Sequence, residues 1–222
     1  MKREIIETAD GSSTIHIPEW NEQYHSKHGA IQEAYHVFIK YGLSNYKDKK
    51  LSVLEIGLGT GLNCFITYLE GIKNQLEIDY VGVEAYPVSL DEVVKLNYVS
   101  ELKAENHKGI FDRIHSELWG KRIELDSMFS LTKRRHLFNE IDDIESFDLI
   151  YFDAFGARVQ PELWTVELFS KMFRALKMNG ILVTYSAKGS VRRAMLEVGF
   201  EVEKLPGPPG KREMLRALKP KE

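Results

Sequence analysis

The chain has 222 residues, of which 43% are hydrophobic and 28% are charged, and its formal net charge is −3. This composition is typical of one globular domain with a real core, and the small negative charge excludes a protein that binds nucleic acid over its whole surface. Short apolar runs, a polar N-terminus and the single Cys64 exclude a membrane span, a secretory signal and an internal disulfide framework, so we expect a cytoplasmic protein with no membrane partner.

The first 50 residues predict a small extension ahead of the core. Residues 4–17 contain two β-prone runs around an Asp-Gly turn, which indicates a β-hairpin. Residues 29–41 carry apolar side chains at helical spacing, and Gly42 follows as a stop signal. We therefore expect a hairpin and a helix before the core begins.

From residue 51 onward, short apolar runs alternate with helical segments. We predict strands at 51–57, 79–84, 147–153 and 180–186, one or two strands within 121–135, and helices at 61–71, after Pro87, from Pro161 to a close at Asn179-Gly180, and at 188–198. Such alternation predicts a mainly parallel sheet with helices on both faces.

The end of the chain departs from that alternation. Residues 200–205 and 211–218 are joined only by the turn GPPG (207–210), so they must be antiparallel. A parallel α/β sheet that ends in an antiparallel hairpin is typical of class I methyltransferases, which are Rossmann-like. We expect one domain over residues 1–222, with residues 1–50 as the extension and residues 51–222 as the catalytic core.

A glycine-rich loop follows the first core strand in LEIGLGTGLN (54–63). Gly57, Gly59 and Gly61 permit positive φ and close approach of a ligand, and the next helix begins at once. The spacing differs from G-x-G-x-x-G and lacks G-K-[ST], so it resembles motif I of methyltransferases that use S-adenosylmethionine rather than a dinucleotide or P-loop motif. Glu84 ends the second strand, where an acid accepts hydrogen bonds from ribose hydroxyls. The alternative is a plain turn with a solvated Glu84.

Asp153 ends the apolar run FDLIYFD (147–153), at the edge of the sheet where ligands bind. An alkyl amine has a pKa of about 10, so only about one molecule in a thousand is uncharged at pH 7, a penalty of roughly 4 kcal/mol. A carboxylate can orient the amine, accept its proton and stabilise the charge that nitrogen gains. We expect Asp153 to face a methyl-accepting amine; the alternative is a cap on the following turn.

Nearly the whole chain resembles the methyltransferase domain of the MnmC family, which also occurs alone as MnmD. The similar segments are YHSKHGAIQEAYHVFI (24–39), LEIGLGTGLN (54–63), LIYFDAFGARVQPELW (149–164), VRRAMLEVGF (191–200) and GPPGKREML (207–215). The resemblance implies methylation of the aminomethyl group of 5-aminomethyl-2-thiouridine at the tRNA wobble position, which gives 5-methylaminomethyl-2-thiouridine.

The resemblance also implies roles for single residues. Asp153 is the acid that faces the substrate amine. The residues expected to hold S-adenosylmethionine are Glu55, Gly57, Gly59, Thr60, Gly61, Asn63 and Glu84. The residues expected to bind substrate are Phe155, Lys211 and Arg212. Two departures stand out: Gly156-Ala157-Arg158 replaces the family's Ala-Pro, and His136 or Leu137 falls where the family has an acid near the adenine.

Other cofactors are not expected. The bifunctional relatives carry a flavin-dependent oxidase domain after the methyltransferase, and this chain ends at Glu222, so we expect no FAD. His25 and His28 lack the cysteine or acid partners of a metal site, so we expect no metal.

The expected partner is tRNA with a modified wobble uridine, and basic residues are available to bind it. They are Lys188, Arg192, Arg193, Lys204, Lys211, Arg212, Arg216 and Lys219, with a second cluster at 133–135. Two other readings stay open. One is a small-molecule amine methyl- or aminopropyltransferase of the same fold, and the other is a degenerate methyltransferase fold that only binds RNA.

Overall fold

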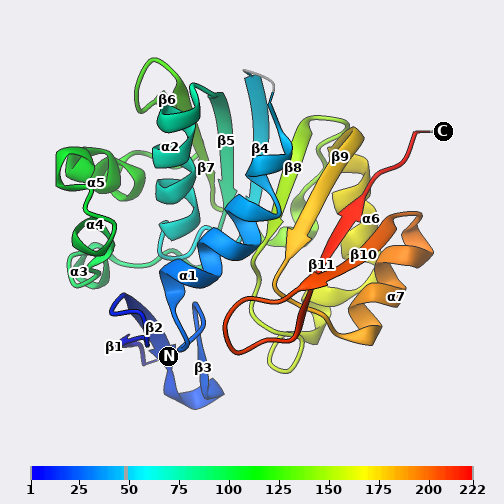
Figure 1. Cartoon of the computed structure of the whole chain (residues 1–222), viewed down its shortest axis with the longest axis horizontal. Helices are drawn as coiled ribbons and strands as arrows, with labels where there is room; N and C mark the ends of the chain where they lie inside the picture. The colour runs from blue at the N-terminus through cyan, green and yellow to red at the C-terminus, as the bar shows by residue number, and fades with distance from the viewer. Residues whose placement is uncertain (1, 48–49, 222) are drawn as a thin grey trace.

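The computed structural model describes residues 2–47 and 50–221, which form one large and one small β-sheet. The large sheet has the strand order β10-β11-β9-β8-β4-β5-β7-β6 (Figure 1). Its strands are β4 (Lys50–Ile56), β5 (Glu77–Val83), β6 (Arg122–Glu124), β7 (Phe129–Arg134), β8 (Phe147–Phe152), β9 (Leu176–Thr184), β10 (Glu201–Pro206) and β11 (Glu213–Leu218). The neighbours from β9 to β7 are parallel, whereas β6 pairs antiparallel with β7, and β11 pairs antiparallel with both β9 and β10. The mainly parallel sheet with a closing antiparallel hairpin is confirmed.

Helices cover both faces of this sheet because alternate strand residues point to opposite sides. On β4, Val53 belongs to the core cluster of α2 (Leu62–Asn74), and Leu54 belongs to the cluster of α6 (Val166–Ala175) and α7 (Gly189–Val198). The α2 face also receives α1 (Ala30–Ala34), which continues as a π-helix over Tyr35–Lys40. The three short helices beside α2 in Figure 1 are α3 (Leu90–Val93), α4 (Tyr98–Glu101) and α5 (Lys108–Ser116).

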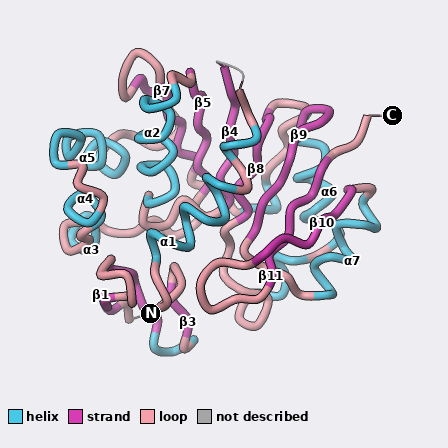
Figure 2. Tube along the Cα trace, viewed as in Figure 1, coloured by secondary structure: helices cyan, strands magenta, loops and turns pink. Residues whose placement is uncertain are grey.

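The N-terminal extension forms the small sheet, from β1 (Glu4–Glu7), β2 (Ser13–Ile17) and β3 (Glu22–Gln23). The hairpin of β1 and β2 was predicted, whereas β3 was missed because it has only two residues. The small sheet lies at the carboxyl-terminal edge of the parallel strands, near the loop between β10 and β11 (Figure 2). Asp10 in the hairpin turn accepts a hydrogen bond from the Gln32 amide (2.9 Å), which ties the hairpin to the start of α1.

The helix predicted to begin at Pro161 is shorter than expected at both ends. Pro161–Trp164 is a 3₁₀ turn, and α6 starts only at Val166, after Thr165 accepts a hydrogen bond from the Leu168 amide as the cap. The prediction that Asn179-Gly180 closes this helix is wrong, because β9 already starts at Leu176. Asn179, with φ of 62°, donates its amide to the Lys219 carbonyl (2.9 Å), so strand pairing overrides the helix-stop signal.

The other 3₁₀ turns are short connectors. They lie at Pro18–Trp20, Leu43–Asn45, Glu105–His107 and Phe138–Glu140. Within residues 2–47 and 50–221, no helix is both long enough and apolar enough to cross a membrane.

Candidate active site

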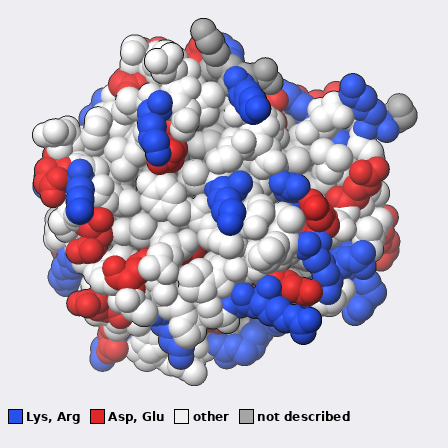
Figure 3. Space-filling model, viewed as in Figure 1, with Lys and Arg blue, Asp and Glu red and all other residues white. Residues whose placement is uncertain are grey.

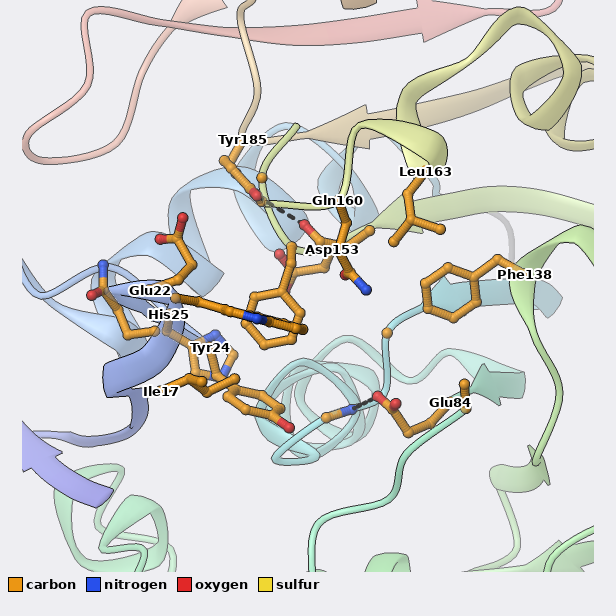
Figure 4. A pocket seen from close by; sticks show the side chains of 18 of the residues that line it. Ile17, Glu22, Tyr24, His25, Glu84, Phe138, Asp153, Gln160, Leu163 and Tyr185 are labelled. Atoms are coloured by element: carbon orange, nitrogen blue, oxygen red, sulfur yellow. Dashed lines mark hydrogen bonds between the residues drawn. The ribbon is translucent and has the colours of Figure 1, made fainter. Parts of the chain in front are cut away.

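A cavity of about 730 Å³ opens at the carboxyl ends of β4, β5 and β8. One wall comes from the N-terminal segment, with Ile17, Glu22 and Tyr24, and the opposite wall carries Phe138 and Leu163 (Figure 4). Asp153 lies between the two walls. This edge of a parallel sheet is the place where ligands of open α/β folds bind.

The glycine loop after β4 forms part of the cavity lining. Gly57, Gly59 and Gly61 all have positive φ, of 90°, 46° and 71°, and Gly57 and Gly59 line the cavity. A Cβ atom on Gly57 would lie 2.7 Å from the Asp153 carbonyl oxygen, so the loop has no room for a side chain there. The Gly57 amide donates to the Val83 carbonyl (3.0 Å), which fixes the loop against the end of β5. Gly57 and Gly59 therefore present backbone without side chains to the cavity.

Glu84 follows β5 and lines the same cavity, as predicted from its position. Its carboxylate accepts hydrogen bonds from the amides of Gly59 (3.1 Å) and Tyr86 (2.9 Å). These two donors hold the acid beside the glycine loop, where a ribose can reach it.

The other predicted cofactor residues lie one layer behind the cavity. Glu55, Thr60, Gly61 and Asn63 are buried and are not among the lining residues. Asn63 sits in the first turn of α2, and its side-chain amide donates to Glu55 (2.9 Å) and to Asp153 (2.8 Å). Tyr80 donates to the second oxygen of Glu55 (2.8 Å). This places Asn63 as a support for Asp153, a role that sequence spacing alone did not indicate.

Asp153 is the acid at the centre of the site. Its amide donates to the Ile56 carbonyl (3.0 Å), which holds it beside the end of β4. Burial, reinforced by the negative charge of Glu33, raises the pKa of the Asp153 carboxyl to about 7, while the Asn63 hydrogen bond and the Lys211 charge oppose that rise. A carboxyl with a pKa near neutrality is suited to accept and release a proton.

Phe155, in the segment after β8, packs against the N-terminal extension. Its ring makes edge-to-face contacts with Trp20 (5.5 Å between centroids) and Tyr24 (4.9 Å). The loop is held further by Arg158, which donates to the Trp20 carbonyl (2.9 Å) and pairs with Glu22 (3.1 Å). Arg158, which departs from the family pattern, therefore holds the segment that carries Phe155 against the N-terminal extension.

The predicted pair Lys211 and Arg212 divides between two environments. Lys211 lines the cavity, whereas Arg212 is exposed and is not among the lining residues. Two lining residues, Glu33 and Tyr185, contact Lys211 and were missed. Glu33 lies within the family-like segment 24–39 but was given no role of its own, and Tyr185 lies in a predicted strand. Helical periodicity placed Glu33 on a helix, but only the tertiary structure brings it to the site.

Near the expected adenine position, the cavity wall is apolar. Leu137 and Phe138 line it, whereas His136 is exposed and does not. Leu163, from the segment after β8, lies on the same wall as Phe138, and Gln160 from that segment also lines the cavity (Figure 4). An apolar wall with a nearby side-chain amide is suited to hold an aromatic base. Among the described residues, no cluster of three His, Cys, Asp or Glu is arranged to hold a metal ion.

Comparison with known proteins agrees with this arrangement. A family model described as S-adenosyl-L-methionine-dependent methyltransferase matches residues 99–220. The "tRNA 5-methylaminomethyl-2-thiouridine biosynthesis bifunctional protein MnmC" of Hydrogenovibrio crunogenus is 27% identical over 208 residues, and that of Campylobacter fetus is 29% identical over 218 residues. The alignments cover 88% and 91% of this chain but 31% and 34% of those proteins, so the chain spans about a third of their length.

Solved structures show the same fold. The crystal structure of MNMC2 from Aquifex aeolicus superposes with a TM-score of 0.78 at 25% identity, covering 100% of this chain and 73% of that one. Spermidine synthase from Thermotoga maritima superposes with a TM-score of 0.59 at 16% identity, covering 98% of this chain and 69% of that one, which shows a shared fold alone. The fold is that of class I S-adenosylmethionine-dependent methyltransferases.

Proposed function

The chain belongs to the S-adenosyl-L-methionine-dependent methyltransferase family, and from that premise we propose that it methylates the aminomethyl group of 5-aminomethyl-2-thiouridine at the tRNA wobble position. The observation that carries this proposal is the position of Asp153, a carboxyl with a pKa near 7 that opens into the cavity beside the glycine loop. The similarity to the MnmC proteins, whose name gives tRNA 5-methylaminomethyl-2-thiouridine biosynthesis, supports the choice of substrate.

The residues of the site fit S-adenosylmethionine. Gly57 and Gly59 offer bare backbone, Glu84 offers a carboxylate for ribose hydroxyls, and the wall of Phe138 and Leu163 offers an apolar surface for adenine. When bound, the cofactor supplies a methyl group on a positively charged sulfur. The proposed reaction is a transfer between sulfur and nitrogen and needs neither flavin nor metal.

Asp153 has the decisive part in this proposal. An uncharged amine must present its lone pair to the methyl carbon, so that the new nitrogen–carbon bond forms as the carbon–sulfur bond breaks and its electron pair stays on sulfur. The nitrogen then carries a positive charge and releases one proton. Asp153 is placed to orient the amine and to take that proton directly or through water, and Phe155 offers an aromatic ring beside it.

The charge distribution supports a nucleic-acid substrate near this opening. Lysine and arginine side chains gather over the region of α7, β10 and β11 on the face shown in Figure 3. Lys188, Arg193 and Arg212 are exposed there. Cationic side chains beside a site are what a phosphate backbone requires, despite the negative total charge. With tRNA as its substrate, the protein would act in the cytoplasm.

The choice between a tRNA and a free amine is tested by turnover. We expect methyl transfer to tRNA carrying 5-aminomethyl-2-thiouridine to exceed transfer to putrescine or spermidine at equal concentration by at least about a hundredfold. Binding of that tRNA should weaken steeply with salt, because its phosphates release counterions. Equal turnover of the free amines would assign the protein to small-molecule chemistry, and failure to bind S-adenosylmethionine in a calorimeter would leave only RNA binding.

A further inference from the structure

An ion pair between a buried carboxylate and a partly exposed lysine joins two distant parts of the chain beside Asp153. Glu33 lies on α1, and Lys211 lies in the loop between β10 and β11. The Lys211 ammonium is 2.5 Å from the Glu33 carboxylate, whose side chain is only 8% exposed. The second oxygen of Glu33 accepts a hydrogen bond from the Ser26 amide (2.8 Å), so the carboxylate is held at both ends.

The Lys211 ammonium also packs on an aromatic ring. It lies 3.8 Å from the centroid of Tyr185, and the Tyr185 hydroxyl donates to the carbonyl of Ala154, the residue after Asp153 (2.8 Å). Glu33, Lys211, Tyr185 and Asp153 all line the same cavity. The ion pair and the reacting carboxyl therefore share one wall of the site.

This ion pair is poorly explained as a device for stability. Removing the Glu33 carboxylate from water costs several kcal/mol, and attraction to a partly exposed lysine often does no more than offset that cost. It is also poorly explained as a phosphate contact, because Lys211 is already paired, whereas its neighbour Arg212 is exposed. A charge pair kept at the wall of a reaction cavity points to an electrostatic role within it.

We propose that Glu33 and Lys211 are positioning residues whose opposed charges set the protonation state of Asp153, and hence the pH range in which the site accepts a proton from the amine. The negative charge of Glu33 favours protonated Asp153, and the positive charge of Lys211 favours the ionised form. The part of the inference that concerns the amine rests on the proposed function.

Several other polar and titratable groups lie around Asp153. Asn63 from α2 does not titrate, and burial raises the pKa values of Glu55 and Tyr185 well above their usual range, which favours the uncharged form of each. His25 is uncharged as well, because burial lowers its pKa to about 4. Glu22, which faces Tyr185 from β3, is paired with Arg158. Among the charged residues that line the cavity, Glu33 and Lys211 are those whose charges shift the pKa of Asp153.

The test measures Asp153 directly. The cofactor-free protein is labelled with ¹³C at the aspartate carboxyl carbons, the Asp153 signal is assigned by its loss in Asp153→Asn, and the signal is followed from pH 4 to pH 9. Glu33→Gln should lower the Asp153 midpoint and Lys211→Met should raise it, each by about 0.5 to 1 pH unit, the size expected for one nearby charge. The double variant should lie between the two single variants.

In Lys211→Met, the carboxylates of Glu33 and Asp153 face one cavity without the lysine between their charges. Their titrations are coupled, so the proton that the pair keeps longest is lost at a higher pH, whichever residue carries it. The matched control is Lys204→Met, which removes a lysine from the exposed pair with Glu213 (2.9 Å) on the same hairpin and should leave the midpoint unchanged. Shifts of the same sign in Glu33→Gln and Lys211→Met, or no shift in either, would overturn the inference. If Glu33→Gln does not fold, Lys211→Met decides alone: an upward shift supports the inference and an unmoved midpoint overturns it.

Activity separates this inference from the proposed function. The acid limb of kcat/KM for methyl transfer should move with the Asp153 midpoint in each variant. If the midpoints shift as stated but no amine is methylated by the parent protein, the proposed function fails and the electrostatic role of the pair stands. If the amine is methylated and the midpoints do not move, the proposed function stands and this inference fails.

Discussion

Replacing Asp153 by Asn keeps the shape of the side chain and removes its negative charge. In the folded protein the pKa of this carboxyl is about 7, against 3.8 for an ordinary aspartate, so the folded state holds the proton more tightly than the unfolded chain. Below about pH 3.8 the Asp153 carboxyl is protonated in both states and does not lower the free energy of unfolding. As the pH rises toward 7, ionisation in the unfolded chain destabilises the folded state progressively, and above pH 7 the penalty is complete. At about 1.36 kcal/mol per pH unit, the full penalty is about 4 kcal/mol.

The side-chain amide introduced by Asp153→Asn still needs hydrogen-bond partners in the buried site, so the substitution should remove only about half of that penalty. We expect the free energy of unfolding to rise by about 2 kcal/mol at pH 8. For a chain of this length the gain corresponds to a rise in Tm of roughly 4 to 8 °C. Thermal unfolding of the cofactor-free parent and variant at pH 4 and pH 8 measures it, and we expect little difference at pH 4.

The matched control is Asp148→Asn. Asp148 accepts a hydrogen bond from the Ser52 amide (2.8 Å) and pairs with Lys177 (2.8 Å), so its charge is partnered and its removal should not stabilise the protein. Methyl transfer should fall by about 10² to 10⁴ in Asp153→Asn only, as expected for loss of a general base. A stability gain that is absent at pH 8, or equal at both pH values, would refute the desolvation argument.

Three further substitutions test the supports of the site. Gly57→Ala should lower cofactor affinity at least about tenfold in calorimetry, because φ is 90° and the new Cβ meets the Asp153 carbonyl at 2.7 Å. The control Gly120→Ala, with φ of 77° and open space around it, should leave the affinity unchanged. Equal effects of the two substitutions would contradict the steric reason. Glu84→Ala should weaken cofactor binding by about 1.5 to 3 kcal/mol, and an unchanged affinity would remove Glu84 from the site. Asn63→Leu should destabilise the protein to urea by about 2 to 4 kcal/mol, since both Glu55 and Asp153 lose a donor; a loss below about 1 kcal/mol would show that the shared amide matters little.

The alternation of strands and helices in the core and the edge of the sheet that carries the site followed from sequence, because hydrophobic period and glycine spacing are local signals. Gly57, Gly59, Glu84 and Asp153 each end or follow a predicted strand, and parallel strands bring their carboxyl ends to one edge. The helix after Pro161 was predicted too long because its C-terminal residues pair with β8 and β11 as the strand β9, a non-local interaction.

Contacts across the chain were beyond a sequence argument. Glu33 meets Lys211 across 178 positions, and Arg158 reaches the Trp20 carbonyl across 138. No spacing rule relates residues so far apart; only the packing of the N-terminal extension, with its sheet and α1, against the core brings them together. Likewise, Asn63 follows the glycine motif and was expected to touch the cofactor, whereas its side chain turns inward to Glu55 and Asp153.

The most direct test of the central claim is mass analysis of nucleosides after reaction with S-adenosylmethionine that carries a trideuterated methyl group. The substrate is tRNA bearing 5-aminomethyl-2-thiouridine, and the parent protein is compared with Asp153→Asn. We predict 5-methylaminomethyl-2-thiouridine that carries the deuterated methyl on its side-chain nitrogen with the parent protein, and a rate reduced by about 10² or more with the variant. Absence of this nucleoside with the parent, or equal formation by both proteins, would contradict the account.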